Sequence, residues 1–73
     1  MKTTYEMISE MKKLNVIRDN ERIIDSYTDF DGAIDGLFIT IITAEDFHVY
    51  FKTTYFYNYV TKEYKFIHVN GCM

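Results

Sequence analysis

Apolar residues near the start of the chain recur at the spacing of a helix. Four of them fall at positions i, i+1, i+4 and i+7 and so form one stripe: Met7, Ile8, Met11 and Leu14. Just before the stripe, Thr3 and Glu6 form a capping-box pattern, in which the threonine hydroxyl accepts from the Glu6 amide and the carboxylate reaches back. Together these features predict a helix over residues 4–14 with its apolar stripe in the core.

Charge and an asparagine mark the end of this helix. Lys12 and Lys13 fall in its last turn, where cations complement the helix dipole. Asn15 can adopt the left-handed conformation that ends many helices. Beyond it we expect a short strand at Val16-Ile17 and a tight turn at Asp19-Asn20.

Four later stretches are rich in β-branched and aromatic residues and are bounded by turn residues. We expect strands at Arg22–Phe30, Leu37–Thr43, Phe47–Tyr57 and Glu63–Val69. Their connections are short, which favours antiparallel neighbours in a meander. The expected fold is α+β, with one N-terminal helix packed on a four-stranded antiparallel β-meander. We find no repeat or linker, so residues 1–73 are expected to form a single small domain.

The stretch Leu37–Thr43 is apolar on both faces, which predicts a central strand that is covered on both sides. In the strand before it, simple alternation would place Ile24 and Phe30 on one face and Ile23 and Tyr27 on the other. The helix can cover only one face of the sheet. Because a chain of 73 residues has little else to cover the second face, and because small domains bury a low share of their surface, we expect a homodimer.

Composition narrows the class of protein further. The chain is 48% hydrophobic, which excludes general disorder, but its apolar stretches fall short of the ~20 residues of a membrane-spanning helix. Its first 17 residues mix charged and apolar positions, unlike a signal peptide. Cys72 is the only cysteine, so no disulfide forms within the chain. We expect a cytoplasmic protein with no membrane partner, acting in the host cytoplasm if it is virus-encoded.

A metal site is the first chemical candidate. The motif Asp29-x-Asp31-Gly32-x-x-Asp35 brings together carboxylates of the kind that calcium binds. However, the glycine and the closing glutamate of an EF-hand loop are missing from their required positions, and Asp-Gly pairs are ordinary hairpin residues. We therefore expect a turn here, with no metal and no cofactor.

Catalysis is not expected either. His68 and Cys72 lie four residues apart near the end of the chain, where a catalytic pair would not be held in place, and with His48 they lack the close spacing of a structural zinc site. Ser9 and Ser26 lie in no nucleophile motif. The three glycines form no phosphate-binding loop. The sequence thus predicts a protein that is not an enzyme.

The C-terminal part is aromatic and weakly basic, which raises the alternative of a single-stranded nucleic-acid binder. The residues concerned are Tyr50, Tyr55, Tyr57, Tyr59, Tyr64 and Phe66, interleaved with Lys52, Lys62 and Lys65. Three lysines neutralise few phosphates, and aromatic residues are also what strands favour for packing. We therefore expect no direct nucleic-acid binding, and consider a role in protein contacts more fitting for the tyrosines.

The charge of the chain is unevenly distributed. The net charge is −3, but residues 19–46 carry eight carboxylates against one arginine, a net −7, while the segments on either side each carry +2. Carboxylates are common in solvated turns and strand edges, which is the plain explanation. The functional explanation is that they imitate a nucleic-acid backbone, because such a surface would attract the basic groove of a DNA-binding protein.

The leading hypothesis is a non-enzymatic inhibitor, of the kind viruses encode, whose acidic face occupies a basic host protein such as a DNA-binding protein. The carboxylates expected to stand in for phosphates are Asp19, Glu21, Asp25, Asp29, Asp31 and Asp35. One alternative is a protein-interaction module that uses exposed tyrosines or a sheet edge without mimicry. The other is the single-stranded nucleic-acid binder described above.

Overall fold

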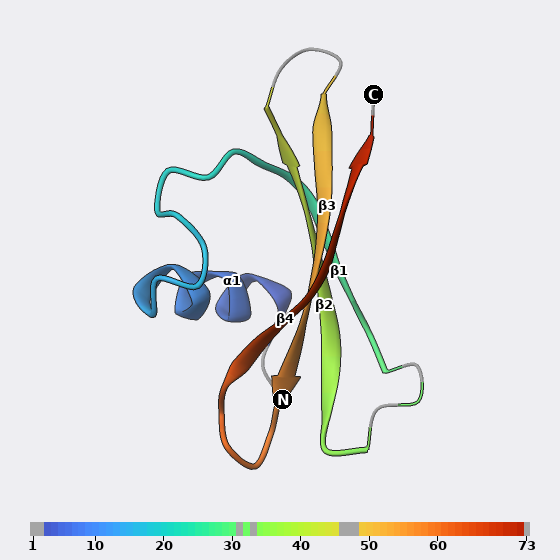
Figure 1. Ribbon diagram of the computed structural model, residues 1–73. Helices are drawn as coiled ribbons and strands as arrows, with labels where there is room; N and C mark the ends of the chain where they lie inside the picture. Colours follow the sequence, from blue (N-terminus) through green and yellow to red (C-terminus); the bar gives the residue numbers. More distant parts are fainter. Residues whose placement is uncertain (1–2, 31, 33, 46–48, 73) are drawn as a thin grey trace.

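The computed structural model describes residues 3–30, 32, 34–45 and 49–72, and it shows a helix followed by four strands (Figure 1). The elements are α1 (Thr4–Lys13), β1 (Ile23–Asp29), β2 (Gly36–Ala44), β3 (Tyr50–Asn58) and β4 (Tyr64–Cys72). The strands pair antiparallel in the order β1-β2-β3-β4. This confirms the predicted α+β fold and its meander.

Both predicted ends of the helix are confirmed. The Thr3 hydroxyl accepts from the Glu6 amide at 3.1 Å, and the Glu6 carboxylate accepts from the Thr3 amide at 3.3 Å. Asn15 has a φ of 59°, the left-handed conformation expected of it. The short strand predicted at Val16-Ile17 is wrong, because both amides turn back to hydrogen-bond the Met11 carbonyl and so close the helix end instead.

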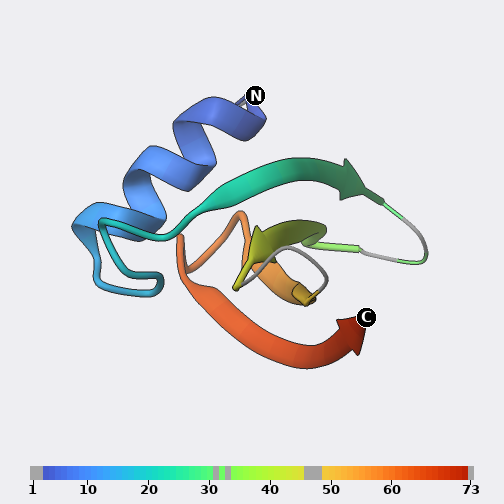
Figure 2. The same ribbon diagram turned by 90° about the horizontal axis from the view of Figure 1, so that it is seen from above.

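The helix and the connection after it lie on one face of the sheet, which we call the helix face (Figures 1 and 2). The axis of α1 runs across the strands. Met7 and Met11 are fully buried against side chains of β2 and β3. The core on this face consists of Met7, Met11, Leu37, Ile39, Ile41, Tyr55 and Tyr57.

The register leaves a second set of side chains on the opposite face, which we call the open face because no described helix covers it. Three cross-strand rows make up this face. They are Asp25–Ile42–Lys52–Asn70, Tyr27–Thr40–Thr54–His68 and Asp29–Phe38–Phe56–Lys65. The prediction that β2 is central is therefore confirmed, while the described elements cover it with a helix on one face only.

Two bulges correct the predicted faces of the outer strands. In β1 the register shifts between Ile23 and Asp25, so Ile23 packs toward the core while Tyr27 lies on the open face. Alternation alone had placed these two residues together, but the extra residue in the bulge reverses the phase. In β4 the partners pass from Phe66 to His68, which makes Ile67 the extra residue.

Small threonines fill the centre of the open face. Thr40 and Thr54 are directly opposite each other, and their hydroxyls share a 3.1 Å hydrogen bond. Both are buried, with exposed fractions of 6% and 9%. Around them Phe38 packs on Phe56 with ring centroids 5.2 Å apart, and the Lys52 ammonium lies 5.9 Å from the centre of the Tyr27 ring.

Candidate interaction site

The structure describes five of the six carboxylates proposed as phosphate mimics, and these five do not lie in one group. Asp25 and Asp29 lie on the open face of β1, and Asp35 lies exposed in the connection to β2. Asp19 and Glu21 precede β1. Asp31 lies outside the described residues. Thus three of the five described carboxylates belong to β1 or its hairpin and two do not.

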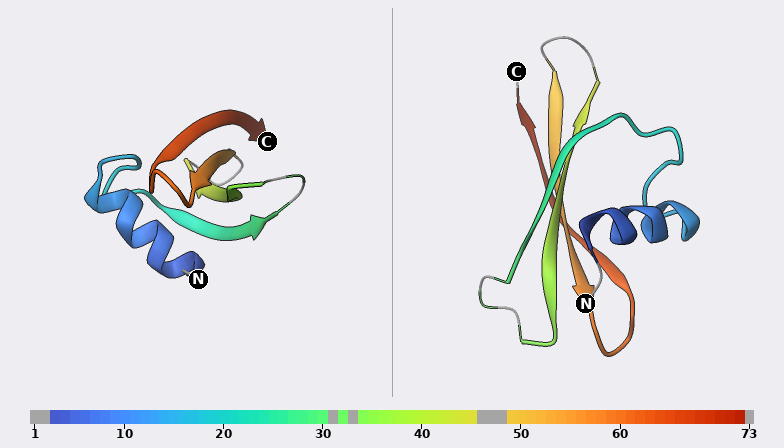
Figure 3. Two further views of the ribbon diagram at one scale, coloured as in Figure 1. Left: turned by 90° about the horizontal axis from the view of Figure 1, so that it is seen from below. Right: turned by 180° about the vertical axis from the view of Figure 1, so that it is seen from behind.

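The described carboxylates are spread along the length of the sheet: Asp25 pairs with Ile42 toward the end of β2 that adjoins Arg22, whereas Asp29 pairs with Phe38 near the beginning of β2. The Arg22 carbonyl accepts from the Ala44 amide at the end of β2, whereas the Asp35 carbonyl accepts from the Tyr59 amide beyond its beginning. A strand of nine residues such as β2 is about 26 Å long between its end residues. Figure 3 shows the connection before β1 at one end of the sheet and the β1–β2 hairpin at the other. The carboxylates therefore form no single cluster.

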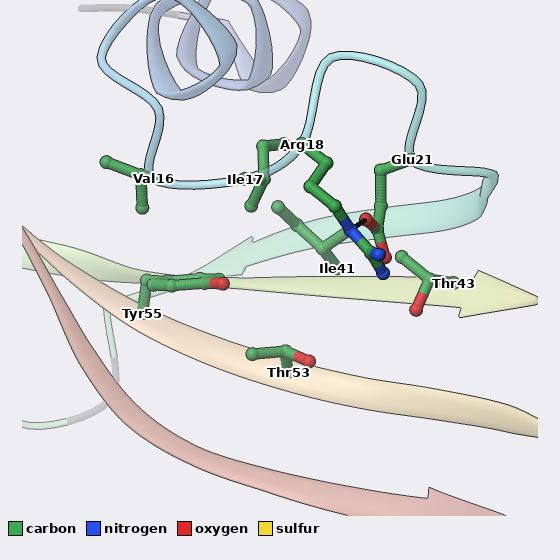
Figure 4. Close-up of a pocket in the computed structure, with 8 residues that line it drawn as sticks. All are labelled: Val16, Ile17, Arg18, Glu21, Ile41, Thr43, Thr53 and Tyr55. Atoms are coloured by element: carbon green, nitrogen blue, oxygen red, sulfur yellow. Dashed lines mark hydrogen bonds and ion pairs between the residues drawn. The ribbon is translucent and has the colours of Figure 1, made fainter.

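Glu21 is the only one of the five described candidate carboxylates that is not exposed. Its side chain is 19% exposed, and its Oε2 accepts from the Arg18 Nε at 3.0 Å. Both side chains reach over a pocket of about 200 Å³ between the α1–β1 connection and the sheet (Figure 4). The pocket is lined by Val16, Ile17, Arg18, Glu21, Ile41, Thr43, Thr53 and Tyr55. An ion pair within the chain thus already engages this carboxylate.

Tyr55 forms part of the floor of that pocket. Burial, and secondarily the negative charge of Glu21, raise the pKa of the Tyr55 phenol above its usual value. A neutral phenol, a carboxylate and the Thr43 and Thr53 hydroxyls can exchange hydrogen bonds with a small polar molecule. None of the lining residues is a histidine or cysteine, and the described residues contain no group of three metal-ligating side chains. The pocket has the chemistry of a binding site rather than of a nucleophilic one.

Another carboxylate fixes the start of β4. The Tyr64 hydroxyl donates to Glu10 Oε1 at 2.8 Å, and its ring packs on Tyr57 with centroids 4.6 Å apart. Burial first, and then the hydrogen bond and charge of Glu10, strongly raise the pKa of the Tyr64 phenol. This contact holds the first residue of an outer strand against the helix.

Beyond Tyr64, β4 is an exposed outer strand. Every residue from 65 to 71 is exposed, and large apolar side chains are among them: Phe66 is 54% exposed, Ile67 41% and Val69 49%. Within the described residues β4 pairs with β3 alone. A depression of about 530 Å³ lies beside the first residues of β4, and Lys65 and Phe66 contribute to its lining. Such an edge is a template for pairing with another strand.

The two sides of β4 differ chemically. Phe66 and Val69 lie on the helix face, opposite Tyr55 and Thr53, and the Phe66 ring meets the Tyr55 ring edge-on at 6.0 Å. Lys65 and His68 lie on the open face. One side of the edge is therefore apolar and the other is basic or polar.

Sequence analysis missed this edge because it ended the strand at Val69 and treated His68 and Cys72 as lying near a chain end that would not hold them in place. The structure continues β4 through Cys72, whose backbone pairs with Tyr50. The signal that could have shown it is the length of the preceding strand. A nine-residue β3 offers partners for a fourth strand of equal length, and the pairing extends to its end.

Comparisons with known proteins add no relative: no family model matches the chain, and no curated protein or solved structure shows significant similarity to it. Of the helical part that the structure describes, nothing is long and apolar enough to cross a membrane. The functional argument therefore depends on the geometry of this chain.

Proposed function

We propose that this protein is a non-enzymatic interaction module that binds an extended segment of a partner protein at the edge of β4. The observation that supports it is a nine-residue outer strand whose side chains from 65 to 71 are all exposed, including three large apolar ones. Strand addition at such an edge supplies backbone hydrogen bonds, while alternate side chains give specificity. Natural sheets usually protect long apolar edges. β4 has two protective features, Lys65 and the bulge at Ile67, but it still exposes three large apolar side chains, which supports use of this edge.

The chemistry of the edge defines the partner segment. An added strand would place alternate side chains on the helix face, beside Phe66 and Val69, and the others on the open face, beside Lys65 and His68. Apolar residues suit the first side and acidic residues suit the second. The expected partner segment therefore alternates apolar and acidic residues.

The edge proposal keeps the setting suggested by the sequence. We propose a cytoplasmic site of action, in a host cell if the protein is virus-encoded, where binding at β4 inhibits the partner. The nucleic-acid mimic is the second candidate, supported by Asp25, Asp29 and Asp35 lying along β1 and its hairpin. Glu21 gives the mimic less support, because its side chain lines the pocket on the helix face and pairs with Arg18.

Peptide binding tests the edge proposal. The probes are two synthetic peptides as long as β4, nine residues, with valine alternating with aspartate in one and with lysine in the other. The aspartate peptide should shift the amide NMR signals of residues 64–72 and bind more tightly than the lysine peptide. Val69→Lys should abolish these shifts, because it puts a charge on the apolar side of the edge, where the added strand would place its valines.

The matched control is Ile24→Lys on β1, because Ile24 is 55% exposed and lies on the other outer strand. It should leave the peptide shifts unchanged. Shifts that spread equally to β1, or no shifts at β4 with either peptide, would contradict the proposal.

A further inference from the structure

We propose that two copies of this chain pack the open faces of their sheets together around a twofold axis parallel to the strands. The occupant of the open face is thus a second copy. Sheets commonly pack face to face in this way, at about 10 Å, with their strands nearly aligned. This surface shares the Lys65 and His68 side chains with the β4 edge but does not use the backbone groups of that edge, and its assignment does not depend on the proposed function.

The charges of the open face are arranged by strand. Its two carboxylates, Asp25 and Asp29, are both on β1, whereas Lys65 and His68 are on β4. Lys52 lies on β3. One outer strand is therefore acidic and the other is basic, on the same side of the sheet.

This arrangement distinguishes between the two twofold axes that can relate stacked sheets. An axis across the strands would place β1 over β1 of the second copy and so bring Asp25 and Asp29 of both copies together, which repulsion disfavours. An axis parallel to the strands places β1 over β4. The charge pattern thus selects the second arrangement.

The register then specifies which residues meet. The axis parallel to the strands keeps each cross-strand row at its own height, so the row Asp29–Phe38–Phe56–Lys65 faces the same row reversed. Asp29 of one copy lies opposite Lys65 of the other, and Phe38 lies opposite Phe56. In the neighbouring row, Tyr27 lies opposite His68. The row Asp29–Phe38–Phe56–Lys65 is thus complementary to itself, whereas the row of Asp25 places Ile42 opposite Lys52.

The open face is large enough for a small interface. Phe38, Ile42 and Phe56 are partly exposed on its inner strands, Tyr27 is 43% exposed on β1, and Tyr50 is 39% exposed at the start of β3. Three strands of nine residues and one of seven give a face of at most about 19 by 30 Å, or roughly 570 Å² on each copy. Twice that area falls in the lower range of specific interfaces. Because the sheets meet by their faces, the backbone groups at the β4 edge stay accessible.

Charge reversal and charge exchange test this arrangement in the full chain. Sedimentation equilibrium should show a monomer–dimer equilibrium for the natural sequence. Lys65→Glu should raise the dissociation constant at least about tenfold, because it places two carboxylates opposite each other. The double variant Asp29→Lys/Lys65→Glu should restore dimerisation, because the exchanged charges attract again.

Lys62→Glu is the matched control, because it makes the same charge change at an exposed loop position outside the open face. It should leave the dissociation constant within about twofold, and circular dichroism should show that every variant is folded. A natural protein that stays monomeric at millimolar concentration overturns the inference. So does a dimer that tolerates Lys65→Glu, or one that the double variant does not restore; loss of peptide binding at β4 bears only on the proposed function.

Discussion

The Tyr64 hydroxyl donates a 2.8 Å hydrogen bond to the Glu10 carboxylate and so joins two residues that are 54 positions apart. Glu10 lies in the second turn of α1 and Tyr64 is the first residue of β4. Because the core residues beneath α1 come mainly from β2 and β3, this bond ties the helix to the outer strand on which the proposed function depends.

Removing the Tyr64 hydroxyl should lower stability. We expect Tyr64→Phe to reduce the free energy of unfolding by about 1 kcal/mol, the typical net value of such a bond at a partly buried site. Urea denaturation followed by circular dichroism measures the change. Tyr5→Phe is the control, because Tyr5 is 81% exposed, and it should have no measurable effect.

Alkaline pH should destabilise the fold. The folded state raises the pKa of Tyr64 and Tyr55 above the value of about 10 found in an unfolded chain. The folded protein therefore binds the two phenol protons more tightly than the unfolded chain does. The resulting contribution to the free energy of unfolding is complete below pH 10 and is lost as the pH rises through the folded pKa values. Urea midpoints measured from pH 8 to 12 should fall above about pH 10, and less steeply in Tyr64→Phe; equal slopes would contradict the assignment.

The threonine pair at the centre of the open face should be strongly coupled. Thr40→Val leaves the buried Thr54 hydroxyl without its partner, and we expect a loss of about 1–2 kcal/mol in unfolding free energy. The double variant Thr40→Val/Thr54→Val should be closer to the natural protein than the sum of the two single changes, because neither hydroxyl is then left alone. A double-mutant cycle in urea measures this, and strict additivity would show that the hydroxyls do not depend on each other.

Gly36 should be intolerant of any side chain. A Cβ at this position, where β2 begins, would collide with the Tyr57 carbonyl oxygen and crowd the Phe56 ring. Gly36→Ala should therefore cost about 2–3 kcal/mol through displacement of the β3 backbone. Gly71→Ala is the control, because a Cβ there meets only the Phe51 ring, at 3.4 Å, and its effect should stay within about 0.5 kcal/mol. Thermal unfolding of both variants gives the comparison.

The carboxylates of the β1 side should not be needed for binding at β4. Replacing Asp25, Asp29 and Asp35 by asparagine removes three negative charges from the far side of the sheet. We expect the valine–aspartate peptide to bind equally well or slightly more tightly, because its own acids are repelled less. A titration at low and high salt measures this. A tenfold or greater loss of affinity would contradict a binding site confined to the β4 edge.

Sequence patterns predicted the helix and strand positions correctly where the pattern depended on neighbouring residues. The capping box of Thr3 and Glu6, the left-handed Asn15 and the apolar run at 37–43 each depend on neighbouring residues, and each has the predicted structure. Val16-Ile17 shows the limit of such patterns. These residues have strand propensity, but their amides instead donate to the Met11 carbonyl. These hydrogen bonds close the C-terminal end of the helix, so no strand forms there.

The sequence by itself determined an α+β meander, because the spacing of apolar residues and the short turns leave few other ways to bury them. Only the tertiary structure decided which face each outer-strand residue occupies, because a single bulge in β1 or β4 reverses the alternation on which a pattern depends. It also decided that the described carboxylates are spread along the sheet, from Glu21 near one end to Asp35 near the other. An extended strand separates residues that are close in sequence, and a count of charges along the chain does not include this distance.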